Sequence, residues 1–137
     1  MTESGADPFA TWPERWFGCW REFGRGYERC PAVGTFVDGS WAHPRHADIV
    51  AYLSSAPVVA TTSRSAIPWA IGPGDGRSTV SYRSDGGWLW LDDLDYYVAE
   101  HGVRLPDAFV AAIEARAYTP PDDLGADIDD LPWPPVG

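Results

Sequence analysis

The chain has 137 residues, an apolar share of 45% that includes eight tryptophans, and a formal net charge of −10. This length and apolar content fit a single domain with one core. The excess of carboxylates disfavours direct binding to DNA or RNA, because such binding needs Lys and Arg to neutralise phosphates. It favours a basic protein as partner, since opposite fields speed encounter.

The cysteine content and the N-terminal sequence predict a cytoplasmic protein. Cys19 and Cys30 are the only cysteines, which is too few for a disulfide scaffold, so we expect buried free thiols. The first thirty residues contain no basic segment followed by an apolar run, and no stretch approaches the length of a membrane span. Residues 1–8 are small and polar and are expected to be disordered.

An aromatic stripe predicts the first helix. Between Phe9 and Tyr27 aromatic residues recur at intervals of three and four, the spacing that places side chains on one helical face. Thr11 and Glu14 resemble a capping box. We therefore expect a helix over about residues 12–23, with its aromatic side chains in the core.

The next segments alternate between loop, helix and strand signals. Residues 31–45 contain glycines and prolines and predict a loop with room for a short hairpin around 35–41. Apolar residues at helical spacing predict a second helix over residues 44–56, stopped by Pro57. The β-branched run at 58–62 predicts a strand.

The centre of the chain predicts an antiparallel meander. Strands are expected at 67–71, 78–82 and 87–90, in addition to the strand at 58–62. The connecting segments contain glycines and aspartates, which suit tight turns. The glycine-rich loop 71–77 lacks the Lys-Ser/Thr pair and the following helix of a phosphate-binding loop, so a hairpin turn explains it better.

Two amphipathic helices are expected after the sheet, over 93–101 with Asp92 as N-cap and over 106–117. The predicted fold is α+β: a small antiparallel sheet of about four strands, with helices before and after it packed on one face. We assign residues 9–118 to one domain. Residues 119–137 form an acidic tail with five aspartates and five prolines, which should not fold alone.

The strongest candidates for catalysis are His43, His46 and Asp48, which form an H-x-x-H-x-D cluster at a helix start. Such groups could hold a divalent metal or supply a base. Pro44 places His43 outside the helix, however, and Asp48 suits a helical first turn. Surface histidines and a favourable first-turn charge explain the cluster better, and we predict neither a metal nor a cofactor.

A thiol nucleophile is the other catalytic alternative. Cys19 or Cys30 would need a histidine together with Asp38 or Asp48, and the sequence contains these residue types without a spacing that brings them together. The sequence therefore supplies the ingredients of such a site but not its arrangement.

One segment resembles a pattern of small, uncharacterised bacterial proteins of actinobacterial type, with the form DGxWxW…LxYYV…LPxxF. These proteins are similar in size and composition to immunity proteins of polymorphic toxin systems. The resemblance covers about a quarter of the chain and implies an inhibitor that binds a toxin. Its residues here are Asp85, Gly86, Trp88, Trp90, Leu94, Tyr96, Tyr97, Val98, Leu105, Pro106 and Phe109.

Two functions follow as expectations. The first is a non-enzymatic protein-binding module, an immunity- or antitoxin-like inhibitor of a basic partner, with Tyr96 as an exposed anchor beside Asp92, Asp93 and Asp95. The alternative is a small enzyme or small-molecule-binding protein with a tryptophan-lined pocket, in which one of the three histidines of the chain acts as base.

Overall fold

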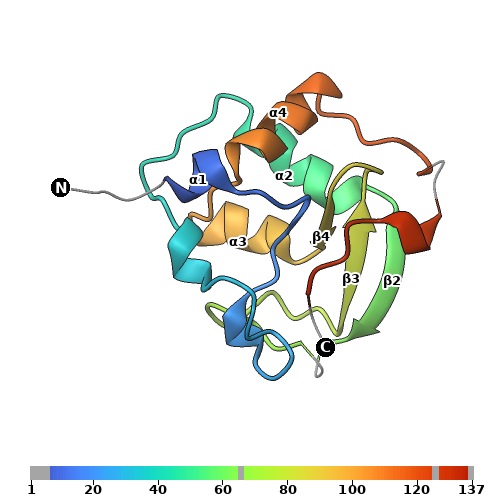
Figure 1. Ribbon diagram of the computed structural model, residues 1–137. Coiled ribbons are helices and arrows are strands. Elements are labelled where there is room, and N and C mark those ends of the chain that lie inside the picture. The colour runs from blue at the N-terminus through green and yellow to red at the C-terminus, as the bar shows by residue number, and fades with distance from the viewer. Residues whose placement is uncertain (1–6, 65–66, 125–126, 136–137) are drawn as a thin grey trace.

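The computed structural model describes residues 7–64, 67–124 and 127–135 and confirms the α+β architecture (Figure 1). The helices are α1 (Pro8–Thr11), α2 (His46–Ser55), α3 (Leu94–Glu100) and α4 (Asp107–Ala115). The strands are β1 (Trp16–Phe17), β2 (Val58–Ser63), β3 (Thr79–Ser84) and β4 (Leu89–Leu91). Three short 3-10 helices, η1 (Arg21–Phe23), η2 (Val33–Phe36) and η3 (Ile128–Asp130), complete the described elements.

The sheet has four strands in the order β1-β4-β3-β2. Strands β2, β3 and β4 form the predicted antiparallel meander, whereas β1 pairs with β4 in parallel. The strand predicted over 67–71 is wrong, because this segment is an irregular loop. Pro68 within it lacks the N–H group that a strand pairing requires. The fourth strand is therefore β1, and the sheet is mixed.

The long N-terminal helix predicted over 12–23 is also wrong. The helix ends at Thr11, because Trp12 precedes Pro13 and the proline ring disfavours helical backbone at that position. Trp12 accordingly has an extended ψ of 116°. The helix that does form begins earlier than expected: Asp7 caps it by accepting a hydrogen bond from the Phe9 amide at 2.9 Å. Residues 1–6 of the predicted disordered segment lie outside the described residues.

The hairpin expected around 35–41 does not form within the described chain. Residues Val33–Phe36 form η2 instead, and Val37 makes an isolated antiparallel bridge with Val103. The bridge ties this loop to the segment that joins α3 and α4. The predicted helices over 44–56, 93–101 and 106–117 are confirmed as α2, α3 and α4, each slightly shorter than expected.

Strand β4 lies at the centre of the core, with all three of its residues fully buried. On one face, Trp90 lies between Tyr52 of α2 and Phe109 of α4, with ring centroids 6.1 and 5.3 Å away. Its indole N–H donates to the Leu53 carbonyl at 2.9 Å. Trp88 stacks on the same Phe109 ring at 4.5 Å. This face is therefore covered by helices, as the sequence predicts.

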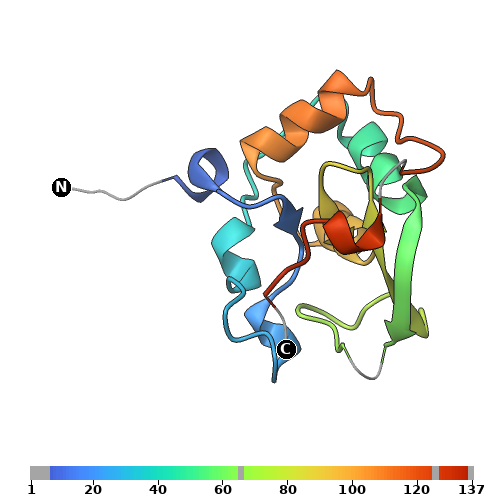
Figure 2. The ribbon, with the colours of Figure 1, turned by 45° about the vertical axis from the view of Figure 1, so that its right-hand side comes forward.

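The acidic tail packs against the opposite face of the sheet. Tyr82 pairs with Leu91 in the register and points away from the Trp90 face, and its ring lies 5.2 Å from that of Trp133. Leu131 is only 6% exposed. Figures 1 and 2 show the tail crossing the sheet and passing beside β1. The tail thus gains its order by docking onto the domain.

Trp90→Ala should lower the free energy of unfolding by about 3–5 kcal/mol, the usual cost of truncating a buried tryptophan. The substitution removes the ring between α2 and α4 and the hydrogen bond to Leu53. Urea denaturation measures the change. Ile128→Ala, at a side chain that is 49% exposed, is the control and should change stability by less than about 1 kcal/mol. Equal effects of the two substitutions would contradict the assignment of β4 to the core.

Leu131→Ala should lower the free energy of unfolding by about 2 kcal/mol, because it removes a buried side chain through which the tail contacts the domain. Thermal unfolding followed by circular dichroism checks this. An unchanged melting temperature would show that the Leu131 contact contributes nothing to stability.

Candidate functional site

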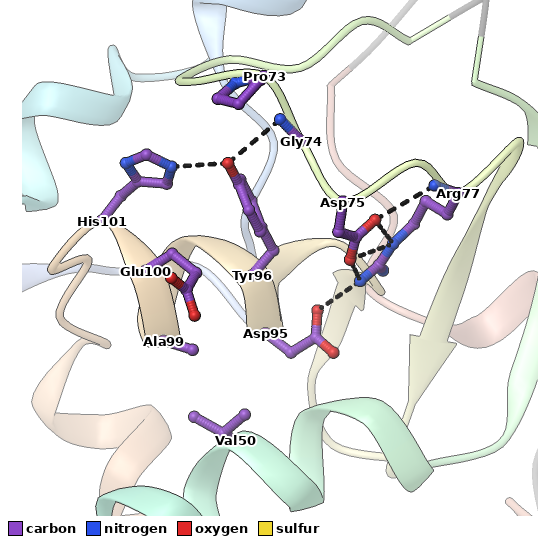
Figure 3. Close-up of a pocket in the computed structure, with 10 residues that line it drawn as sticks. All are labelled: Val50, Pro73, Gly74, Asp75, Arg77, Asp95, Tyr96, Ala99, Glu100 and His101. Carbon is purple, nitrogen blue, oxygen red and sulfur yellow. Dashed lines mark hydrogen bonds and ion pairs between the residues drawn. The ribbon is translucent and has the colours of Figure 1, made fainter.

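An open groove of about 620 Å³ lies between the loop 73–77, helix α3 and the neighbouring helix α2 (Figure 3). None of its lining residues is buried, so the groove is accessible along its length. Its lining residues are Val50, Pro73, Gly74, Asp75, Arg77, Asp95, Tyr96, Ala99, Glu100 and His101. Two of them, Tyr96 and Asp95, belong to the binding surface predicted from the sequence.

Tyr96 forms the wall of the groove and is half-buried rather than a free anchor. Its hydroxyl accepts a hydrogen bond from the Gly74 amide at 3.2 Å and is hydrogen-bonded to His101 Nε2 at 2.9 Å (Figure 3). Behind it, the ring of Trp69 lies 4.8 Å away. Tyr96 therefore joins the loop to the helix and holds one edge of the groove in place.

The glycine-rich loop can pack closely on Trp69, the ring behind Tyr96, because Gly74 has no side chain. A Cβ atom at this position would lie 2.1 Å from the ring of Trp69, and its φ of +78° is unfavourable for other residues. The loop is thus a wall of the groove. The hairpin turn predicted at 71–77 does not form, since residues 67–71, which were expected to be its first strand, are irregular.

Arg77 neutralises part of the acidic lining. Its guanidinium pairs with Asp75, contacts Asp95 at 3.3 Å and donates to the Asp92 carbonyl at 3.1 Å. Hydrogen bonding to Arg77 lowers the pKa of Asp75, whereas burial raises the pKa of Asp95 despite the same arginine.

Glu100 is the one carboxylate of the lining that makes no hydrogen bond or ion pair within the described chain. It is exposed and follows Tyr96 by four positions, so the two share a face of α3. The sequence offers Glu100 together with Asp92, Asp93 and Asp95 as a possible acid/base set, but the predicted binding surface does not include it, although its i, i+4 spacing from Tyr96 was a usable signal. The predicted surface also lacks Arg77, which reaches the site through a loop whose path the sequence does not reveal.

The other predicted acidic residues lie behind the groove. Asp92 is not an N-cap: its Oδ1 accepts from the Ser81 amide at 3.1 Å and so ties β3 to the start of α3. Asp93 is fully buried, and its Oδ2 lies 2.9 Å from a guanidinium nitrogen of Arg64 and accepts from the Tyr97 hydroxyl at 3.2 Å. Asp93 therefore cannot contact a partner directly.

Burial raises the pKa of Asp93 to about 6, and the Arg64 guanidinium opposes this shift only in part. Oδ2 carries both hydrogen bonds, while the buried Oδ1 has no partner among the described residues. Arg64 also donates to the Ile67 carbonyl at 2.6 Å. The pair thus fastens the irregular loop 67–71 to α3.

The candidate cluster of His43, His46 and Asp48 does not form a site. His43 Nε2 lies 3.2 Å from Glu114 of α4, whereas Asp48 pairs with Arg45. The His46 ring lies 5.7 Å from that of Trp41. Across the described ranges, no three potential ligands come together in a way that could hold a metal ion. None of these three residues lines the groove.

The two cysteines are free and buried, and neither lines the groove. Burial raises the pKa of the Cys19 thiol, which is the opposite of the activation that a nucleophile requires. A hydrogen bond with Cys19 lowers the pKa of Cys30. Since the described contacts place no histidine beside either thiol, a thiol nucleophile has no structural support.

The alternative site predicted from the sequence, a tryptophan-lined pocket with a histidine base, has its two components in two separate hollows. The groove contains His101 but no tryptophan. A smaller hollow of about 320 Å³ between the tail and the β1 segment contains Trp16 and Trp133 but no histidine. The two halves of that predicted site therefore do not meet.

Asp93→Asn should remove a pH-dependent part of the stability. The pKa of Asp93 is about 6 in the folded protein and near 3.8 when the chain is unfolded, so the folded state takes up the proton first on acidification. Considered by itself, protonation of Asp93 therefore raises the free energy of unfolding as the pH falls through 6. The difference in unfolding free energy between the native protein and Asp93→Asn should shift by about 1 kcal/mol between pH 7 and pH 5.

Urea denaturation at the two pH values measures this difference, and a carbon-13 NMR titration of the Asp93 carboxyl gives its midpoint. A midpoint below pH 4.5 would contradict the assignment of Asp93 as a carboxyl whose burial outweighs its arginine partner.

Comparisons with protein-family models, curated proteins and solved structures found no match to the chain. No helix in the described residues has both the length and the apolar character needed to cross a membrane. The resemblance of the DGxWxW…LxYYV…LPxxF segment to small bacterial proteins therefore stays a prediction.

Proposed function

We propose that the protein is a non-enzymatic protein-binding module, an immunity- or antitoxin-like inhibitor whose groove receives a basic segment of its partner. The unpaired carboxylate of Glu100 is the observation that carries this proposal. Asp75 and Asp95 already share Arg77, so Glu100 leaves the groove with uncompensated negative charge. A lysine or arginine of the partner would supply the missing cation.

The shape of the groove supports the same function. Its lining is open rather than enclosed, which suits a protruding segment of a protein. Tyr96 is held by its hydrogen bonds to Gly74 and His101, so its ring costs little further entropy when a partner contacts it. A partly exposed ion pair contributes only about 0.2–1 kcal/mol, so we expect the charge to act mainly on the association rate.

The proposal places the protein in the cytoplasm. Its two cysteines are free thiols, as expected for a reducing compartment. The formal charge of −10 suits a partner that is itself basic, such as a nuclease or another protein that binds nucleic acid.

Glu100→Lys should slow association with the partner by roughly tenfold at low salt, because it reverses the uncompensated charge of the groove. The partner is first captured with the tagged protein from a lysate of its source organism, then purified. Surface plasmon resonance at increasing salt gives the rates. Asp129→Lys is the matched control, since it makes the same charge change at an exposed site of the tail outside the groove.

The control should lose much less of the association rate than Glu100→Lys, and the difference should shrink as salt screens the charges. If both variants associate at the same rate, the field of the whole chain steers the partner and the groove is not its site.

A small-molecule-binding protein or small enzyme is the second candidate. The groove volume lies in the range of ligand pockets, roughly 300–1,000 Å³. His101 and Tyr96 supply two titratable groups in hydrogen-bond contact. This candidate would replace the binding-module proposal under two conditions. No partner would be captured from the lysate, and the protein would bind or turn over a small substrate in a way that His101→Gln abolishes.

A further inference from the structure

The two edges of the sheet differ in their protection. β1 forms one edge with only two residues, and the tail passes beside it. β2 forms the other edge with six residues and pairs only with β3 among the described strands. Figure 2 shows β2 at the outer side of the molecule. An unpaired edge presents backbone N–H and C=O groups to any strand that approaches it.

The sequence of β2 lacks the charged residues and prolines that usually prevent pairing at an edge. Its six residues, VVATTS, include four β-branched residues and neither a charge nor a proline. None of the six is buried, and Val58 is 49% exposed. One β-bulge lies between Val58 and Ala60, so the strand is regular from Ala60 onward. Charged residues and prolines normally keep such edges apart.

The hydrogen-bond register shows which groups point outward. Arg64 donates its backbone N–H to the Ser78 carbonyl, and Thr62 pairs with Val80. Along an antiparallel strand, the backbone N–H and C=O groups of successive residues point alternately toward and away from the neighbouring strand. Since those of Thr62 and Arg64 point toward β3, the N–H of Thr61 points away from it. Thr61 therefore lies in the middle of the open edge with its backbone available for a further pairing.

We propose that β2 pairs antiparallel with β2 of a second copy of this chain, forming a two-fold dimer with one continuous sheet. A two-fold axis pairs a strand with itself, and β2 suits this because no like charges would face each other. The nearest arginines are already engaged: Arg64 with Asp93, and Arg83 with the Ala56 carbonyl. The chain has a formal net charge of −10, but β2 contributes none of it, so two copies can meet along this edge without placing carboxylates opposite each other.

The dimer is expected to be weak. A single strand edge buries less than the roughly 1,200 Å² of a typical stable interface, so association should depend on concentration. This inference does not depend on the proposed function, because β2 contributes no residue to the groove.

Sedimentation velocity of the full chain, from roughly 10 μM to 1 mM, tests the proposal. The weight-average mass should rise from that of a monomer toward twice that value. Thr61→Pro removes the outward N–H, and Ala60→Lys places two ammonium groups close together across the two-fold axis, so both variants should remain monomeric. Ala47→Lys makes the same charge change at an exposed position of α2 and should dimerise like the native protein.

Circular dichroism shows whether each variant is folded. If Thr61→Pro is unfolded, Ala60→Lys alone tests the proposal. Hydrogen exchange gives an independent readout: the Thr61 amide should exchange at least about fivefold more slowly at the highest concentration. A native protein that stays monomeric throughout, or a dimer that persists in Ala60→Lys, overturns the proposal. If the chain is monomeric and Ala60→Lys instead abolishes binding of a captured protein, the edge belongs to that partner.

Discussion

Burial of β4 on both faces is the constraint on which the rest of the structure depends. Trp90 requires α2 and α4 on one side, because a tryptophan of this size is buried only when two elements enclose it. On the other side, the Tyr82 face of the sheet is covered in part by the tail through Trp133. An acidic segment with little apolar content of its own is thereby ordered by the surface on which it docks.

The end of β4 determines where the groove forms. Asp92 and Asp93 follow the strand directly, and each binds a part of the chain distant in sequence: Asp92 the Ser81 amide, Asp93 the guanidinium of Arg64. These contacts set the start of α3, and so the direction in which Tyr96 and Glu100 face. The same contacts bring the loop 67–77 alongside the helix. A buried ion pair of this kind adds little net stability, but it specifies one arrangement of the loop.

The sequence predicts the parts whose signals are local. Asp85-Gly86 before Trp88 predicts the turn into β4, and the spacing of Phe109 and Ile113 predicts α4. The sequence does not predict the parts whose structure depends on contacts between residues distant in the chain. The aromatic stripe after Phe9 matches a helix, but Pro13 directs Trp12 into extended backbone, and the rings pack edge to face around Phe36 instead. Which aspartate near β4 is buried depends on Arg64, and no local pattern shows that.

We propose that the groove between loop 73–77 and α3 contacts a basic protein partner. Hydrogen–deuterium exchange of the purified protein with and without that partner tests it most directly. If the partner binds in the groove, exchange should be slower at residues 73–77 and at the C-terminal turn of α3, around Glu100, while the tail from Asp127 to Trp133 is unaffected. Slower exchange confined to the tail or to the β1 segment, with the groove unchanged, would contradict it.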